Sequence, residues 1–148
     1  MHKRHLEPLL DRAIAYAYNE GCRDFYLGGA VGFDTVAARQ VLAFKLSYPD
    51  VRLHLVLPCR DQTDNWSFMA ADMYDYLLSQ ADSVEYTSER YTKGCMLKRN
   101  KRLAELGDIV IAYLGHGRSG ASQTVRLAEE LGRRIYNLYP TLDKYAGR

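Results

Sequence analysis

Two glycine-rich segments carry the residues of this sequence that are best suited to hold a ligand. The first is Gly28-Gly29-Ala30-Val31-Gly32-Phe33-Asp34-Thr35, directly after the apolar run Phe25-Tyr26-Leu27 and directly before a helical pattern. Glycines let backbone N–H groups approach a phosphate, and the start of a helix adds partial positive charge. No Lys-Ser or Lys-Thr pair follows, and the spacing is not a strict dinucleotide fingerprint. A tight corner that binds no ligand is therefore the alternative interpretation.

The second glycine-rich segment follows the strongest buried-strand pattern of the chain, Asp108-Ile109-Val110-Ile111-Ala112-Tyr113-Leu114. It reads Gly115-His116-Gly117-Arg118-Ser119-Gly120-Ala121-Ser122-Gln123-Thr124 and offers glycines, hydroxyl and amide groups, and one arginine. Such groups can wrap a phosphate and a ribose. A long exposed turn is the alternative. His116 is either a phosphate contact or acid, or an ordinary loop histidine.

The elements that must position these segments alternate between strand and helix patterns. Short apolar or branched runs predict strands over residues 25–27, 51–57, 83–86, 108–114 and 134–138. Helical spacing predicts helices over residues 6–17, 34–44, 66–80, 96–106 and 125–131. This alternation favours a three-layer α/β/α sandwich with a mainly parallel sheet. In such a sheet, ligands bind beyond the carboxyl ends of the strands, where both glycine-rich segments fall.

Composition is typical of one globular domain. The chain has 148 residues, of which 47% are hydrophobic and 26% charged. No apolar run approaches the roughly 20 residues that cross a bilayer, and the first residues lack the apolar region of a signal peptide. Cys22, Cys59 and Cys95 lie far apart, which indicates a reducing compartment. We therefore predict a single cytoplasmic domain over residues 1–148 that does not contact a membrane.

The net charge of +2 is too small for a general nucleic-acid coat, but the charge is unevenly distributed. Residues 90–102 include six basic residues and no acidic one, which predicts either a solvated helix face or a site for an anionic ligand. Within this run, Arg99 and Asn100 could reach a phosphate. Gln62 and Trp66 would share one face of a helix, where they either pack beneath a loop or line a base or ribose pocket.

No metal site or catalytic constellation follows from residue spacing. The four histidines show no ligand spacing with the cysteines, and no C-x-x-C pair occurs, so we predict neither a metal nor a required cofactor. No Ser-His-Asp arrangement can be read from the spacing either. Cys59 follows a strand end, and an inert thiol is the preferred interpretation over a reactive one.

Several of these motifs, taken in order, resemble the SLOG superfamily. They are Gly28 to Ala38, Leu57-Pro58-Cys59, Gln62 and Trp66, Tyr91, Lys98-Arg99-Asn100, and Ser119-Gly120-Ala121-Ser122-Gln123-Thr124-Val125. The resemblance spans nearly the whole chain and is greatest to small YpsA/YoqJ-type bacterial and prophage proteins. It implies a Rossmann-like pocket for a nucleotide or a nucleotide-derived ligand such as ADP-ribose or NAD. Similar turns occur in DNA-processing protein A (DprA), whose Rossmann-like domain binds single-stranded DNA, and in the LOG nucleotide hydrolases.

Resemblance and spacing together predict a ligand pocket between the two glycine-rich turns. The predicted ligand-binding residues are Gly28, Gly29, Ala30, Gly32, Phe33, Asp34, Gln62, Trp66, Arg99, Asn100, Gly117, Ser119, Gly120, Ala121, Ser122 and Thr124. The expected partner is a nucleotide-type small molecule. Assembly into a homo-oligomer is left open.

Two departures from the family pattern change these expectations. LOG hydrolases resemble P-G-G-x-G-T-x-x-E at the second turn, and the glutamate position here is Thr124, whose hydroxyl holds no negative charge at neutral pH. We therefore predict binding or sensing, with no catalytic residue assigned. Relatives also begin with a strand inside the sheet that ends in a motif similar to T-G-H-R-P, whereas residues 1–6 here already enter the first helix. We expect this strand to be missing, with a late start, another chain or a rearranged sheet accounting for the gap.

Two further functions are alternatives. The first is hydrolysis of a nucleotide N-glycosidic bond, as in the LOG enzymes, for which Glu85, Glu89 or Asp34 would be needed. The second is single-stranded nucleic-acid binding of the DprA type through residues 90–102 and nearby tyrosines. The near-neutral net charge argues against the second alternative.

Overall fold

Helices and strands alternate along the chain, which confirms the α/β class predicted from sequence. The computed structural model describes residues 3–30, 32–112 and 120–138. The elements within them are α1 (Lys3–Asn19), β1 (Asp24–Leu27), α2 (Phe33–Ser47), β2 (Arg52–Leu57), α3 (Phe68–Gln80), β3 (Ser83–Tyr86), α4 (Cys95–Leu106), β4 (Ile109–Ala112), α5 (Gly120–Glu130) and β5 (Arg134–Asn137). None of the helices in this described part is long and apolar enough to cross a membrane.

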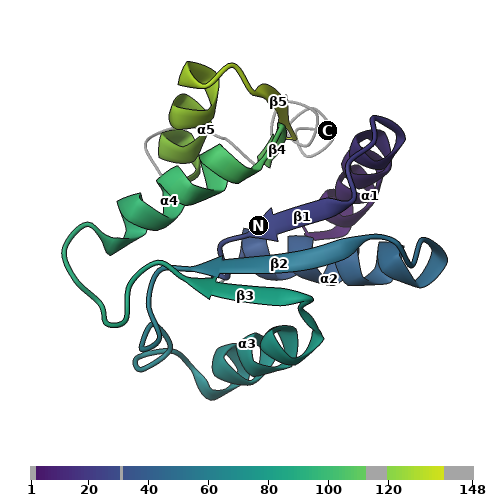
Figure 1. Ribbon diagram of the computed structural model, residues 1–148. Coiled ribbons are helices and arrows are strands. Elements are labelled where there is room, and N and C mark those ends of the chain that lie inside the picture. Colours follow the sequence, from purple (N-terminus) through teal and green to yellow (C-terminus); the bar gives the residue numbers. More distant parts are fainter. Residues whose placement is uncertain (1–2, 31, 113–119, 139–148) are drawn as a thin grey trace.

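The strands form two small parallel sheets (Figure 1). β2 lies between β1 and β3, with Tyr26 opposite His54 and His54 opposite Ser83. β4 pairs with β5, with Ile111 opposite Tyr136. Within the described ranges no strand joins β1 to β4, so the sheet is divided between them. The parallel pairing was predicted, and the division agrees with the expected gap inside the sheet.

Side chains of the β1–β3 sheet alternate between an apolar and a polar face, because successive strand residues point to opposite sides. Leu53, Leu55 and Leu57 of β2 are buried and pack with residues of α2 and α3. The opposite face carries the polar residues Arg52 and His54 of β2, together with the buried Val56. Helix α4 covers part of it through Arg102, whose Nε lies 2.8 Å from a carboxylate oxygen of Glu85 in β3.

Helix α1 builds a second apolar core beside the β4–β5 sheet. Leu6, Leu9 and Leu10 are buried there together with Leu138, which follows β5, and Ile111 of β4 packs against them. On the other side α5 contacts β4, β5 and α4. Helices α1, α2 and α3 therefore cover one side of the strands and α4 and α5 the other, which gives the three predicted layers (Figure 1).

Strand β4 is less buried than its sequence predicted. The run over residues 108–114 gave the strongest buried-strand pattern, yet Ile109, Val110 and Ile111 are only half-buried. The reason is that β4 pairs with β5 along one edge, while its residues also line a cavity between β4 and β1. An apolar run indicates that the side chains of a strand tend to be buried. The neighbouring strands decide whether this burial is complete.

A polar network joins the amino-terminal halves of β1, β2 and β3. Arg52 donates to both carboxylate oxygens of Asp24, at 2.7 and 3.0 Å. The ring of His54 stacks on Tyr26, with its Nε2 2.8 Å from Asp24 Oδ1 and its Nδ1 2.5 Å from Ser83 Oγ. The hydrogen bonds from Arg52 are the main cause that lowers the pKa of Asp24 to about 2. The network therefore favours the charged carboxylate.

This network predicts a loss of stability in acid. Because the pKa of Asp24 is about 2 in the folded chain against an ordinary value of 3.8, its carboxylate stabilises the fold above pH 3.8 and loses that contribution as the pH falls toward about 2. Asp24→Asn should lower the urea midpoint near neutral pH, and its difference from the unchanged protein should shrink over that acid range.

The matched control is Asp75→Asn, at an exposed position of α3. This substitution should leave the urea midpoint near neutral pH unchanged. Equal urea midpoints for Asp24→Asn and the unchanged protein near neutral pH would contradict the prediction.

Candidate functional site

The first glycine-rich turn is closed by side chains from α2 and α4. Arg99 Nη1 donates to the backbone carbonyl of Gly28 at 2.6 Å. The N–H of Ala30 donates to Asp34 Oδ2 at 3.0 Å. A Cβ at Gly28 would lie 2.5 Å from Arg99 Nη1 and 3.2 Å from Asp34 Oδ2, so a larger residue does not fit there without movement. The groups that approach the turn closely in this structure are these two side chains. The predicted approach of a phosphate stays a prediction.

Gly29 is subject to two independent constraints. Its φ of 72° lies in the left-handed region that favours glycine. A Cβ at this position would overlap Leu57 Cδ2 at the end of β2, and would lie 3.6 Å from Tyr74 Cε1 in α3. The backbone of the turn thus rests directly on the apolar end of β2.

The buried Arg99 and the half-buried Asp34 carry opposite charges beside this turn. Arg99 is only 8% exposed. Burial lowers the pKa of its guanidinium, which the charge of Asp34 opposes. Burial likewise raises the pKa of Asp34, against the N–H of Ala30 and the charge of Arg99. Since desolvation is the largest cause for both groups, each charge only partly compensates the other.

Consecutive residues of α4 connect the two parts of the divided sheet. Asn100 is 4% exposed and donates through Nδ2 to Gln123 Oε1 of α5 at 3.0 Å. Its Oδ1 accepts from Arg99 Nε at 2.8 Å. Arg99 is therefore hydrogen-bonded to the end of β1, and Asn100 is hydrogen-bonded to α5. Helix α5 in turn packs on β4 and β5. The two residues predicted from the basic run lie where these attachments are made.

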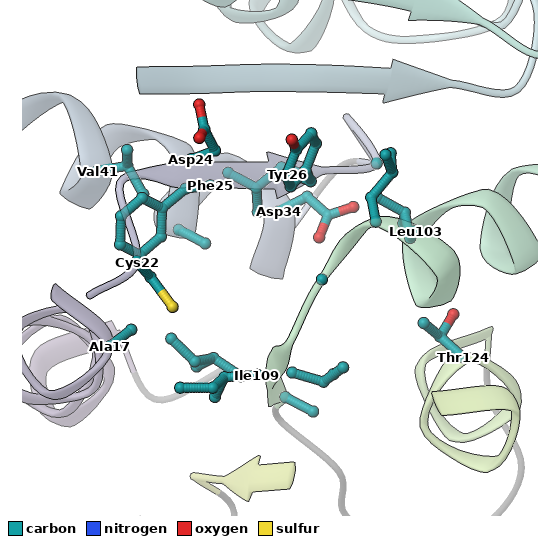
Figure 2. Close-up of a pocket in the computed structure, with 18 of the residues that line it drawn as sticks. Ala17, Cys22, Asp24, Phe25, Tyr26, Asp34, Val41, Leu103, Ile109 and Thr124 are labelled. Carbon is teal, nitrogen blue, oxygen red and sulfur yellow. The ribbon is translucent and has the colours of Figure 1, made fainter. Parts of the chain in front are cut away.

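A cavity of about 610 Å³ lies between β1 and β4 (Figure 2). Asp24 and Tyr26 of β1 line it on one side and Ile109 of β4 on the other. Seven predicted site residues line it together: Gly28, Ala30, Phe33, Asp34, Arg99, Asn100 and Thr124. Gly28 and Ala30 follow β1, and Arg99 contacts the carbonyl of Gly28, so these three residues lie at the carboxyl end of β1. The predicted role of the seven residues in ligand binding stays a prediction.

Gln62 and Trp66 lie near the first turn, but not on a helix as predicted. Helix α3 begins only at Phe68, because the serine that precedes it caps the helix through its side chain. Gln62 Nε2 donates to the Tyr74 hydroxyl at 3.0 Å, and the ring of Trp66 packs edge-on against the Tyr74 ring at 5.3 Å. Both residues therefore support Tyr74 beneath Gly29, and neither lines the cavity.

Tyr74 is a contributor to the turn that sequence reasoning missed. Its place in the helical pattern of residues 66–80 indicated only a core position, which it also occupies, with 7% exposure. The hydroxyl that meets Gln62 could have been suspected from the cost of burying a tyrosine without a polar partner. Its proximity to the glycine turn depends on how α3 packs on β2.

The basic run over residues 90–102 does not form one continuous basic surface. Arg99 is buried, and Arg102 pairs with Glu85. The other basic residues of the run are exposed. The interpretation as a solvated face therefore applies to the exposed residues of the run. The interpretation as a site for an anionic ligand applies to the buried Arg99.

Of the three carboxylates considered for hydrolysis, only Asp34 lines the cavity. Glu85 and Glu89 each pair with an arginine, at 2.8 and 2.9 Å. Cys59 is buried, and burial raises the pKa of its thiol to about 11, which fits the interpretation as an inert thiol. In the described part of the chain, no three His, Cys, Asp or Glu side chains are grouped as metal ligands.

The second glycine-rich segment lies partly outside the described residues. Gly117 and Ser119 belong to the undescribed part, so their predicted role stays a prediction. Helix α5 begins at Gly120, and its backbone includes Ala121 and Ser122. A helix after β4 was predicted, but it was expected to begin at residue 125, so the prediction that residues 120–124 belong to the turn was wrong.

The contacts joining Asp24, His54 and Ser83 contain the groups of a hydrolase triad, which spacing did not reveal. Parallel pairing brings these three residues together although about 30 residues separate each from the next. Ser83 is exposed, and of the three only Asp24 lines the cavity. The carboxylate of Asp24 is also held by Arg52. We therefore assign this network to the stability of the sheet and not to the candidate site.

Comparison with known proteins finds relatives over most of the chain. A family model named YpsA, described as the YspA SLOG family, matches residues 3–125. A UPF0398 protein of Bacillus cereus strain G9842 is 25% identical over 122 residues, which cover 81% of this chain and 66% of the relative. A UPF0398 protein of Bacillus thuringiensis strain Al Hakam is 24% identical over 136 residues, covering 90% of this chain and 74% of the relative. The chain thus spans just under two thirds of the length of the Bacillus cereus relative.

The two constraints on Gly29 predict a specific loss of stability. Gly132 has nearly the same φ, 76° against 72°, but nothing lies within 4 Å of a Cβ built there. Both Gly29→Ala and Gly132→Ala should lose roughly 1–2 kcal/mol to backbone strain. Gly29→Ala should lose about 1–3 kcal/mol more through overpacking against Leu57.

The measurement is urea denaturation of both variants followed by circular dichroism. Equal losses of unfolding free energy would show that the Leu57 contact adds nothing, against the geometry of the turn.

Proposed function

The chain belongs to the YspA SLOG family, and on that premise we propose that it binds a nucleotide or a nucleotide-derived ligand related to ADP-ribose or NAD. The ligand would lie beyond the carboxyl ends of β1 and β4, against the first glycine-rich turn. Its anionic group would face the buried guanidinium of Arg99. Residues of the second glycine-rich segment would complete the pocket.

The observation that carries this proposal is the buried Arg99 beside the first turn. The guanidinium is 8% exposed, and its charge is only partly compensated by Asp34. An anion at this place would add the missing compensation in a low-dielectric setting, where a charge-assisted hydrogen bond is strong. Helices α2 and α5 begin after β1 and β4, and their first N–H groups favour an anion at the same edge.

The described residues support binding more strongly than turnover. The position of the glutamate in LOG hydrolases is Thr124, which lines the cavity but holds no charge at neutral pH. Nucleic-acid binding is also less well supported, because Arg99 is buried and Arg102 is paired with Glu85. These two residues therefore do not add to an exposed basic surface that could bind nucleic acid.

Asp34 favours a second candidate function, the hydrolysis of a nucleotide N-glycosidic bond. It is the one carboxyl considered for this reaction that lines the cavity, and burial raises its pKa. A raised pKa keeps more of the acid form at higher pH, which suits protonation of a leaving base. The N–H of Ala30 fixes the orientation of the carboxyl at 3.0 Å.

Ligand binding is tested by calorimetry with AMP, NAD, ADP-ribose and ribose 5-phosphate. At least one should bind, and Arg99→Lys should weaken it by about tenfold or more, because a charge-assisted contact of roughly 1.5–3 kcal/mol is impaired. Circular dichroism establishes that Arg99→Lys is folded at the temperature of the titration.

The control is Lys98→Met, which removes a neighbouring exposed charge of α4 and should leave the affinity unchanged. Absence of binding by all four ligands, or equal affinity of Arg99→Lys, would contradict the proposal.

The second candidate is tested by chromatography for free base released from AMP or NAD. Any activity that uses the acid form of Asp34 should fall as the pH rises through its raised pKa, and Asp34→Asn should abolish it. Asp64→Asn, at an exposed position, should retain the activity. Absence of released base at every pH would dispose of this candidate.

A further inference from the structure

One hydroxyl at the surface of the β1–β3 sheet lies directly against a histidine ring. Tyr26, His54 and Ser83 are opposite one another on the three neighbouring strands. Nδ1 of His54 is 2.5 Å from Ser83 Oγ, and Nε2 of the same ring is 2.8 Å from Asp24 Oδ1. These contacts stabilise the sheet, and they also leave a hydroxyl oxygen within reach of molecules in solution, since Ser83 is exposed.

The charge of Asp24 decides which nitrogen of His54 carries the hydrogen. The pKa of Asp24 is about 2, so near neutral pH its carboxylate is ionised and only accepts hydrogen bonds. In a neutral ring, Nε2 must therefore be the N–H that donates to Asp24, which leaves a lone pair on Nδ1. The hydroxyl of Ser83 is then the donor to Nδ1. A serine in this arrangement can pass its proton to the ring when its oxygen attacks an electrophile.

The ring of His54 is held in this orientation from several sides. It stacks on Tyr26, with the two ring centroids 4.8 Å apart. Only 16% of its side chain is exposed. Arg52 donates to both carboxylate oxygens of Asp24 and so fixes the group that accepts from Nε2. Because these residues lie on paired strands, the base and the hydroxyl are kept at a constant separation.

The other carboxylates around the ring have cationic partners of their own. Lys45 of α2 lies 2.8 Å from Asp82, which directly precedes β3. Arg102 of α4 lies 2.8 Å from Glu85 of β3. Among the carboxylates that the structure describes, the one within ion-pair distance of His54 is that of Asp24. The protonation of the ring is therefore governed chiefly by this one contact.

We infer that Ser83 is a nucleophile that accepts an acyl group from activated esters, with His54 as its general base and Asp24 as a positioning residue. Oγ of Ser83 forms a bond to the carbonyl carbon of the ester, and its proton passes to Nδ1 of His54. The bond from that carbon to the leaving oxygen breaks. The leaving oxygen or the solvent then takes the proton from His54, and the acyl group remains on Ser83 as an ester.

The position of Ser83 indicates which acyl donors it would take. Ser83 is exposed at the start of β3 and does not line the cavity between β1 and β4. A donor therefore meets an open strand, and its reactivity must come from a good leaving group. Small esters of acidic alcohols and phenols are the class that fits, because they need little help from a binding pocket.

This inference does not rest on the proposed nucleotide site. Asp24 and Ser83 are the first residues of β1 and β3, whereas the nucleotide would lie beyond the carboxyl ends of the strands. Calorimetry reports on the nucleotide, and acylation reports on Ser83. The failure of either leaves the other to be judged separately.

The test is acetylation of the full chain by p-nitrophenyl acetate near neutral pH. Peptide mass spectrometry locates each acetyl group, and hydroxylamine removes esters from serine while it leaves amides on lysine. Ser83 should be acetylated about 100-fold faster than Ser47, an exposed serine at the end of α2, because a positioned base accelerates such a step by roughly 10²–10⁴-fold. Absorbance of the released p-nitrophenolate also counts acetyl groups that water later removes.

Three variants separate a base from a merely structural partner. His54→Gln keeps a polar side chain without a basic nitrogen, and it should slow acetylation of Ser83 to the rate of Ser47. Ser83→Ala should remove the corresponding part of the p-nitrophenolate release. The matched control is Glu85→Gln, on the same face of β3 but paired with Arg102, which should leave the rate at Ser83 unchanged. Circular dichroism establishes that each variant is folded at the temperature of the assay.

The pH dependence is a readout that a structural contact alone would not change. Protonation of His54 occupies the lone pair on Nδ1, so the rate at Ser83 should fall as the pH is lowered and the ring becomes charged. The comparison of Ser83 with Ser47 uses the unchanged protein and holds even if His54→Gln does not fold. The inference is overturned if Ser83 is acetylated no faster than Ser47, or if folded His54→Gln retains the rate of the unchanged protein.

Discussion

The structure depends on the attachment of α4 to both parts of a divided sheet. Arg99 holds the carbonyl at the end of β1, and the next residue, Asn100, holds Gln123 of α5. In a continuous parallel sheet this connection would be made by backbone ladders between strands. Here two buried side chains of one helix contribute to this connection instead. Because an unpaired buried polar group is costly, these side chains must keep their hydrogen-bonding geometry.

The same attachment creates the chemistry of the candidate site. Arg99 must lie beneath the first glycine-rich turn to reach Gly28, and this position removes most of its surface from water. Asp34 reaches the same turn from α2 and is desolvated with it. The structural contact and the proposed position of an anion therefore depend on one arrangement. The glycines at 28 and 29 permit it, since a Cβ at either position would meet a neighbouring side chain.

Much of the fold could be predicted from local pattern. Helical and strand periodicity located the elements, and the glycines after β1 marked the turn between β1 and α2. The prediction was wrong where a short-range interaction shifted an element, as with Gln62 and Trp66, which precede a helix capped by a serine. It was also wrong on the depth of β4, because burial depends on a neighbouring strand and not on the apolar run itself.

By itself, the sequence determined the alternation of strands and helices, the parallel sheet, and the edge at which a ligand site should lie, because these follow from periodicity and chain direction. The tertiary structure alone decided which members of the basic run are buried and which are paired. It also decided that Asp24, His54 and Ser83 meet, and that two strand edges face one cavity. Such features depend on distances between residues far apart in the chain, which local spacing does not encode.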